Sequence, residues 1–163
     1  MKKDASVLKQ EAAAYAVELV ESGMVVGLGH GSTSIHAVRY LAEKLRTGKL
    51  KNVTGVPCSF QVEEEALRYG MPLKKLDDLS SIDLTIDGAD EVDPNLNMIK
   101  GGGGALLREK IVAQISRREV IVVDESKISP MLGKKRPVPV EVIPFGWQFQ
   151  HTFLRTLGAS VTV

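Results

Sequence analysis

Residues 82–110 read IDLTIDGADEVDPNLNMIKGGGGALLREK and hold a strand, an acidic loop, a glycine run and a helix. The apolar run 82–86 has the pattern of a short strand and ends at Asp87. Four glycines follow Lys100, and the segment 105–116 has the length of a helix. A buried strand followed by a helix is the repeating unit of a parallel α/β sheet.

The flanking segments continue this alternation of strands and helices. Further helices are expected at residues 7–22, 32–46 and 59–69. Further strands are expected at residues 24–28, 51–56, 73–76 and 119–123. Residues 1–128 are therefore predicted to form a doubly wound, mostly parallel, Rossmann-like α/β sheet with helices on both faces.

The chain changes character after residue 128, where four prolines punctuate the remaining sequence. Residues 137–143 have the pattern of an edge strand that tolerates proline. A helix is expected at 148–157 and the start of a strand at 159–163. Residues 129–163 are therefore predicted to begin a second, incomplete α+β domain.

Composition narrows the class of protein. The chain has 163 residues, of which 44% are hydrophobic and 25% charged, and a net charge of +1. These values suit one globular domain with a hydrophobic core, or one such domain with a fragment of a second domain. They give no sign of a surface that binds nucleic acid. Cys58 is the only cysteine, and no apolar segment has the length of a membrane span. We expect a cytoplasmic protein with no nucleic-acid or membrane partner.

The first candidate site follows strand 24–28 and reads Gly29-His30-Gly31-Ser32-Thr33. Glycines before a helix N-terminus, together with hydroxyl side chains, can form a phosphate cup. A tight turn capped by a serine or threonine explains the same residues, and both interpretations stay open. The spacing lacks the Walker lysine and the full dinucleotide fingerprint, which disfavours ATP and NAD.

The second candidate site is Asp87-Gly88-Ala89-Asp90-Glu91, at the end of a predicted strand. Two carboxylates facing one pocket suit acid–base chemistry, because crowding or burial raises the pKa of one of them. Magnesium binding and a solvated acidic turn are the alternatives. The lysine and glycine run that follow favour a functional site.

Three charged residues complete the candidates. Lys100 precedes the glycine run and can neutralise an oxyanion, whereas Glu109 on the next helix can abstract a proton from carbon if it is partly desolvated. The position of Glu109 in the helix, taken alone, favours a solvent-exposed side chain. Lys127 follows a third strand end and could contact an anion, although most loop lysines are solvated.

Cys58 has no recognisable histidine partner, so thiol catalysis is not expected.

Five segments of the chain match one known family in order and spacing. They are 26–33, Asp87-Gly88-Ala89-Asp90-Glu91, Lys100 to Gly103 with Arg108-Glu109-Lys110, Asp124 with Ser126-Lys127, and 139–144. On these segments the chain resembles the type A ribose-5-phosphate isomerases. The likeness covers essentially the whole chain.

The resemblance implies reversible interconversion of ribose 5-phosphate and ribulose 5-phosphate in the non-oxidative pentose phosphate pathway, without metal or organic cofactor. It implies that Glu109 carries a proton between C1 and C2 through an enediolate. By the same matching, Asp87 assists ring opening and proton movement on the sugar oxygens, with Asp90 beside it. Lys100 would steady the enediolate charge.

The resemblance also implies a substrate-binding set and a homodimer or larger homo-oligomer. The set is Lys9, Gly29, His30, Gly31, Ser32, Thr33, Asp87, Gly88, Ala89, Asp90, Lys100, Gly101, Gly102, Gly103 and Lys127. Lys9 and Lys127 would offer charge to the phosphate.

The chain departs from the family pattern in residues and in length. His30 stands where threonine is usual, and Cys58 and Val62 stand where small hydroxyl residues are common. Family members continue well beyond residue 163, so a chain truncated at its C-terminus is expected. A non-catalytic sugar-phosphate sensor is the main alternative, and a coenzyme A transferase-like or phosphatase domain is a third. Retention of Glu109 favours the isomerase, because a sensor needs no carbon base.

Overall fold

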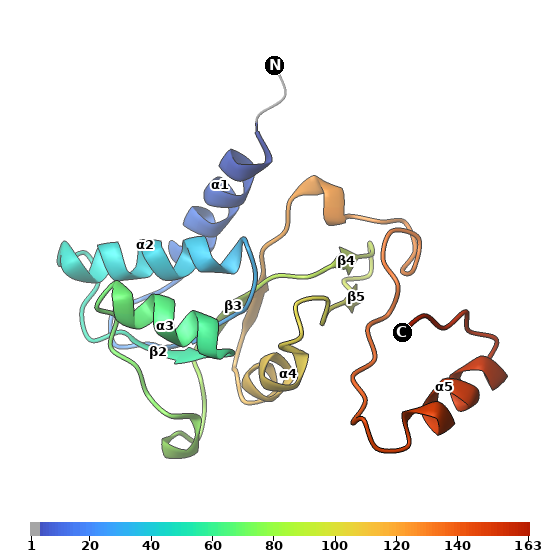
Figure 1. Cartoon of the computed structure of the whole chain (residues 1–163). Coiled ribbons are helices and arrows are strands. Elements are labelled where there is room, and N and C mark those ends of the chain that lie inside the picture. The colour runs from blue at the N-terminus through green and yellow to red at the C-terminus, as the bar shows by residue number, and fades with distance from the viewer. Residues whose placement is uncertain (1–3) are drawn as a thin grey trace.

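The structure is a computed structural model that describes residues 4–163 (Figure 1). Its central sheet consists of the parallel strands β1 (Val25–Leu28), β2 (Thr54–Pro57), β3 (Leu84–Asp87) and β6 (Glu119–Ile121). The strands lie in the order β2-β1-β3-β6. The doubly wound, mostly parallel α/β sheet predicted from the sequence is confirmed.

The strand order creates a switch point between β1 and β3. From β1 the chain crosses to β2 on one side, and it later returns to β3 on the other side of β1. The loops that follow β1 and β3 therefore diverge and leave a crevice above the carboxyl ends of these two strands. Open α/β sheets bind their ligands in such a crevice.

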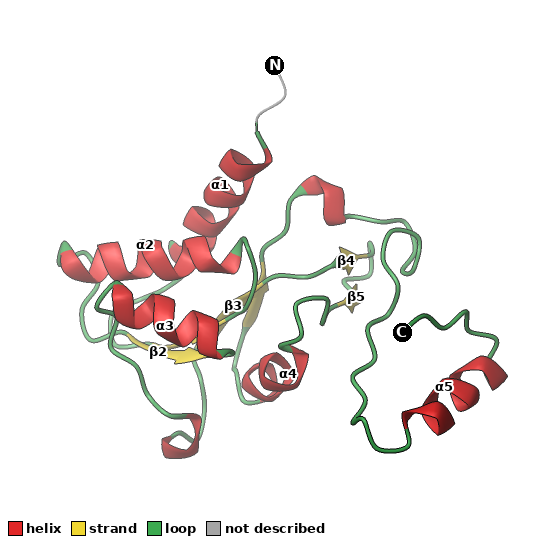
Figure 2. Cartoon of the chain, in the orientation of Figure 1, coloured by secondary structure: helices red, strands yellow, loops and turns green. Residues whose placement is uncertain are grey.

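Helices cover both faces of the sheet, as Figure 2 shows. They are α1 (Ala5–Val17), α2 (Ser34–Arg46), α3 (Phe60–Arg68) and α4 (Leu106–Gln114). Alternate strand residues such as Val26 and Ile86 pack with α1, α2 and α3 in the main core. Val56 packs with Val112 of α4 in a smaller core. This alternation follows from the period of two residues along a strand.

Two helix starts differ in how they are capped. Ser59 caps α3, since its hydroxyl oxygen accepts the N–H of Val62 at 3.2 Å. Thr33 occupies the cap position of α2 but makes no side-chain capping bond. The Ser32 hydroxyl accepts from Lys9 at 3.0 Å instead. The side-chain cap expected from Ser32 or Thr33 is therefore wrong, and the Ser32 hydroxyl binds a lysine instead.

A short hairpin that the sequence analysis did not predict joins β3 to α4. Its strands, β4 (Glu91–Val92) and β5 (Met98–Ile99), pair antiparallel. The hairpin returns the chain to the end of β3, so that Lys100 lies beside Asp87. The buried Glu91 carboxylate accepts N–H groups from Gly133, Lys135 and Arg136 at 3.0 to 3.1 Å. This network, the Glu91 latch, ties the loop 133–136 to the hairpin.

Three predicted strands are absent from the described part of the chain. Leu73 makes one isolated bridge to Gly55, and a 3₁₀ helix follows at Leu76–Asp78. The segments 137–143 and 159–163 contain no strand. Pro137 and Pro139 have no N–H to donate, and an apolar run without a neighbouring strand cannot form a ladder.

The helix predicted near residue 148 is present as α5 (Trp147–Thr156), and none of its residues is buried. Figure 1 shows α5 away from the parallel sheet. A boundary between two domains at residue 128 stays a prediction. Within residues 4–163, no helix combines the length and apolar character needed to cross a bilayer.

Candidate active site

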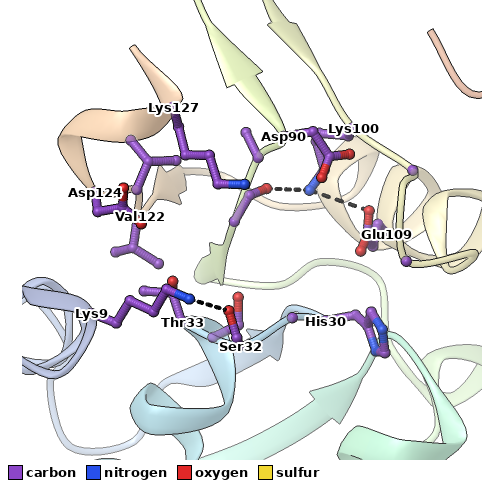
Figure 3. A pocket seen from close by; sticks show the side chains of 17 residues that line it. Lys9, His30, Ser32, Thr33, Asp90, Lys100, Glu109, Val122, Asp124 and Lys127 are labelled. Carbon is purple, nitrogen blue, oxygen red and sulfur yellow. Dashed lines mark hydrogen bonds and ion pairs between the residues drawn. The ribbon is translucent and has the colours of Figure 1, made fainter. Parts of the chain in front are cut away.

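A cavity lies at the carboxyl ends of β1, β3 and β6, above the switch point (Figure 3). Most of the predicted site residues line it: Lys9, His30, Gly31, Ser32, Thr33, Gly88, Ala89, Asp90, Lys100, Gly101, Gly103, Glu109 and Lys127. Gly29, Asp87 and Gly102 lie outside this lining. Ser34, Val122, Val123 and Asp124 also line the cavity.

Lys100 lies between two buried carboxylates. Its Nζ is 3.0 Å from Asp87 Oδ2 and 3.2 Å from Glu109 Oε2, and it also donates to the carbonyl of Gly88. The exposed fractions of the three side chains are 13% for Lys100, 1% for Asp87 and 6% for Glu109. One ammonium thus serves two carboxylates that are almost completely removed from water.

Burial and charge move all three pKa values away from their ordinary positions. Burial raises the pKa of Asp87, against the opposing effects of Lys100 and of the Gly88 N–H, which donates to it at 2.7 Å. Burial also raises the pKa of Glu109, and the negative charge of Asp87 adds to this effect. For Lys100, burial acts downward, but the two carboxylates outweigh it and raise the pKa. The lysine therefore stays charged, while the carboxylates hold protons at higher pH than usual.

Glu109 is directed into the site by the packing of α4. Val112, three residues further along the helix, is buried against the sheet. Residues three apart share one helix face, so the face that buries Val112 also turns Glu109 inward. The exposed glutamate favoured by position alone is therefore wrong. The spacing to Val112 was a signal in the sequence that could have indicated burial.

Two glycines allow the backbone to shape the site. A Cβ on Gly29 would lie 2.2 Å from Asp87 Oδ1, so only glycine lets the end of β1 approach β3 so closely. Gly29 thus packs beneath the cavity rather than lining it. Gly101 has a φ of 104°, a left-handed conformation that turns the chain from β5 toward α4. Next to it, the Gly102 N–H donates to Asp90 Oδ2 at 2.8 Å and fixes that carboxylate.

The opposite end of the cavity carries basic and hydroxyl groups. Lys9 donates to the Ser32 hydroxyl at the start of α2, and Figure 3 shows Lys127 and Asp124 at the same end of the cavity. A helix N-terminus with nearby lysines favours a bound anion. This end of the cavity, which also carries Asp124, therefore suits an anion, whereas Lys100 and Glu109 lie at the other end.

Ser34 and Cys58 were not in the predicted set of site residues, and both interact with Asp87. Ser34, the first residue of α2, lines the cavity with its hydroxyl 3.5 Å from Asp87 Oδ1. Cys58 is fully buried, and burial followed by the negative charge of Asp87 raises the pKa of its thiol. Burial therefore disfavours the thiolate form of Cys58.

No set of three or more histidine, cysteine or acidic side chains suited to a metal ion occurs among residues 4–163.

Residues 54–163 match the family model described as ribose 5-phosphate isomerase A (phosphoriboisomerase A). The chain belongs to this family. It is 56% identical to ribose-5-phosphate isomerase A of Desulfatibacillum aliphaticivorans over 156 residues, covering 96% of this chain and 68% of that protein. It is 54% identical to a probable ribose-5-phosphate isomerase 2 of Arabidopsis thaliana, covering 92% of this chain and 57% of that protein. The family resemblance seen in the sequence is confirmed.

Solved structures of the family agree with the fold. A D-ribose-5-phosphate isomerase in complex with phospho-erythronic acid superimposes with a TM-score of 0.94 at 41% identity, covering 96% of this chain and 68% of that one. The enzyme from Methanocaldococcus jannaschii gives a TM-score of 0.90 at 42% identity, covering 95% of this chain and 68% of that one. The chain thus spans about two thirds of the length of these family structures.

Proposed function

We propose that this chain interconverts ribose 5-phosphate and ribulose 5-phosphate. The observation that carries the proposal is the placement of Lys100 between Asp87 and Glu109 at one end of a cavity whose other end suits a phosphate. Membership of the family supports the same reaction. An aldose–ketose isomerase needs a carbon base, a cation for the enediolate and an anchor for the phosphate, and the cavity offers all three.

Glu109 acts as the carbon base in this proposal. Its carboxylate removes the proton from C2 of the open-chain aldose, and the electron pair of that bond forms a 1,2-enediolate. The negative charge develops on the former carbonyl oxygen, where the Lys100 ammonium stabilises it. Glu109 then returns the proton to C1 while the proton of the C2 hydroxyl moves to the C1 oxygen, and the product is the ketose. The carbon skeleton exchanges only protons with its surroundings, and we propose, as the family resemblance implies, that neither an organic cofactor nor a metal ion takes part.

The other predicted residues bind and prepare the substrate. Lys9, Lys127, Ser32 and Thr33 hold the phosphate, and the backbone from Gly101 to Gly103 lies along the sugar. Asp87 and Asp90 assist ring opening by moving protons on the sugar oxygens. The raised pKa of Asp87 supports this role, because such a carboxyl group exchanges protons closer to neutral pH.

A relative was solved in complex with phospho-erythronic acid. That molecule carries a carboxylate at one end and a phosphate at the other. Its carboxylate resembles the two oxygens of the enediolate, and its phosphate matches the anion-binding end of the cavity. We expect this chain to bind it in competition with ribose 5-phosphate.

The test is the isomerisation of ribose 5-phosphate by the full chain in the presence of EDTA. Replacement of Glu109 by glutamine keeps the size of the side chain and removes the base, so kcat should fall by roughly 10²- to 10⁴-fold. Glu64→Gln, an exposed residue of α3, is the matched control and should leave turnover unchanged. Binding of ribose 5-phosphate without turnover in the wild-type chain would instead identify a binding module.

We further propose that the protein is cytoplasmic and forms a homodimer or larger homo-oligomer. Its exposed apolar side chains support self-association, because Phe145, Phe149 and Ile143 have exposed fractions of 91%, 81% and 74%. Light scattering coupled to size-exclusion chromatography measures the assembly directly, and a monomer at micromolar concentration would contradict this part of the proposal.

A further inference from the structure

The ring of His30 is held on one side by a serine. His30 follows β1 and lines the cavity, and its Nδ1 lies 2.9 Å from the hydroxyl oxygen of Ser59. The same oxygen caps α3 by accepting the N–H of Val62. The serine is therefore fixed by the helix that it caps, and the imidazole is fixed by the serine.

Glycine packing holds the opposite edge of the ring. A Cβ on Gly103 would lie 2.8 Å from His30 Cδ2 and 3.0 Å from Nε2. This edge of the imidazole therefore lies against the glycine segment that forms the cavity wall. Figure 3 shows His30 at the same end of the cavity as Glu109, whereas Lys9 and Lys127 lie at the other end.

The contact between Ser59 and Nδ1 fits either tautomer of the ring, and one of the two carries the ring proton on Nε2. The hydroxyl oxygen already accepts the N–H of Val62, and its single proton is available to His30. When Ser59 donates that proton to Nδ1, the neutral imidazole carries its own proton on Nε2. The cavity then receives an N–H donor with a defined direction.

We propose that Ser59 and His30 form a substrate-positioning pair, in which Nε2–H of His30 donates a hydrogen bond to a sugar oxygen at the Glu109 end of the cavity. This inference rests on the proposed function. Ser59 acts only through the imidazole. The hydrogen bond holds the reacting carbons in line with the carboxylate that moves their proton, because small displacements of a reacting centre slow the chemical step.

Kinetics of four variants test the pair. Loss of one hydrogen bond lowers kcat/KM about tenfold, which is the effect expected for His30→Ala. Ser59→Ala should lower it several-fold, since the ring then loses its orientation. His30→Gln should recover most of the loss, because its side-chain amide can donate from a similar position. His151→Ala, in the remote helix α5, is the control and should match the wild type.

Nitrogen-15 spectra of the histidine rings test the tautomer and the contact independently of turnover. We expect His30 to be the Nε2–H tautomer, and we expect its signals to move when ribose 5-phosphate is added. Loss of the Nε2–H tautomer in Ser59→Ala would support the orienting role, provided that circular dichroism shows an intact fold.

Three results would overturn the pair: an Nδ1–H tautomer, unmoved His30 signals at saturating ribose 5-phosphate, or unchanged kcat/KM in His30→Ala. If the wild-type chain binds ribose 5-phosphate without turning it over, the proposed function fails, and the nitrogen spectra still decide whether His30 contacts the sugar.

Discussion

Removal of the Lys100 charge should destabilise the protein in a way that depends on pH. Lys100→Met keeps the length of the side chain but leaves Asp87 and Glu109 buried without their shared cation. An uncompensated buried charge costs about 3–5 kcal/mol of unfolding free energy. Protonation of one carboxylate relieves this cost, so the loss should be large near pH 8 and smaller near pH 5.

The direction of this pH dependence follows from the change in the carboxylate pKa. In the variant, the native carboxylate pKa rises further above its unfolded value, so the folded state binds more protons than the unfolded state. Stability is then greatest below the unfolded pKa and is lost as the pH rises through the native pKa. While one proton is exchanged, the slope is about 1.4 kcal/mol per pH unit.

Urea unfolding followed by far-UV circular dichroism at about pH 5 and about pH 8 measures this dependence. Lys44→Met is the matched control, because Lys44 pairs at 2.8 Å with the exposed Glu18. That pair should contribute less than about 1 kcal/mol at both pH values. An equal loss at the two pH values in Lys100→Met, or a loss no larger than that of the control, would refute the reasoning.

Three further predictions concern catalysis, packing and the Glu91 latch. The acid limb of kcat/KM should lie above the ordinary glutamate pKa of about 4.3, since Glu109 must be ionised and its pKa is raised; an unshifted limb would contradict this. Gly29→Ala should cost about 1–3 kcal/mol in urea unfolding, because the new Cβ would meet Asp87. Gly88→Ala has no contact under 3.6 Å and should be neutral. Glu91→Gln should speed tryptic cleavage within residues 133–136, and an unchanged cleavage rate would speak against the latch.

The sequence predicted the parallel sheet well, because the apolar pattern of each strand lies within a few consecutive residues. Short apolar runs rich in β-branched residues indicated the parallel strands, and three candidate site segments were expected to follow strand ends. The run 137–143 has the same apolar character, yet it forms no strand. A strand exists only when another strand supplies its hydrogen bonds, and a local pattern carries no information about such a partner.

The residues of the candidate site could be predicted from the sequence, but their burial and contacts were harder to predict. Asp87 and Lys100 followed from their positions at a strand end and before a glycine run. Burial of Glu109 depends on how α4 packs, and the hairpin β4–β5, which returns Lys100 to Asp87, was not predicted. The contact between Ser59 and His30 joins two loops that are 29 residues apart, which no local pattern indicates.

The position of Lys100 has a consequence for the charge balance of the proposed reaction. With both carboxylates ionised, Asp87, Glu109 and Lys100 together carry one negative charge. When Glu109 takes the carbon proton, its charge disappears and the same charge arises on the enediolate, still beside the lysine. The total charge of the cavity is then constant from substrate to product. No ion has to enter or leave, and the surrounding dipoles need little rearrangement during the proton transfer.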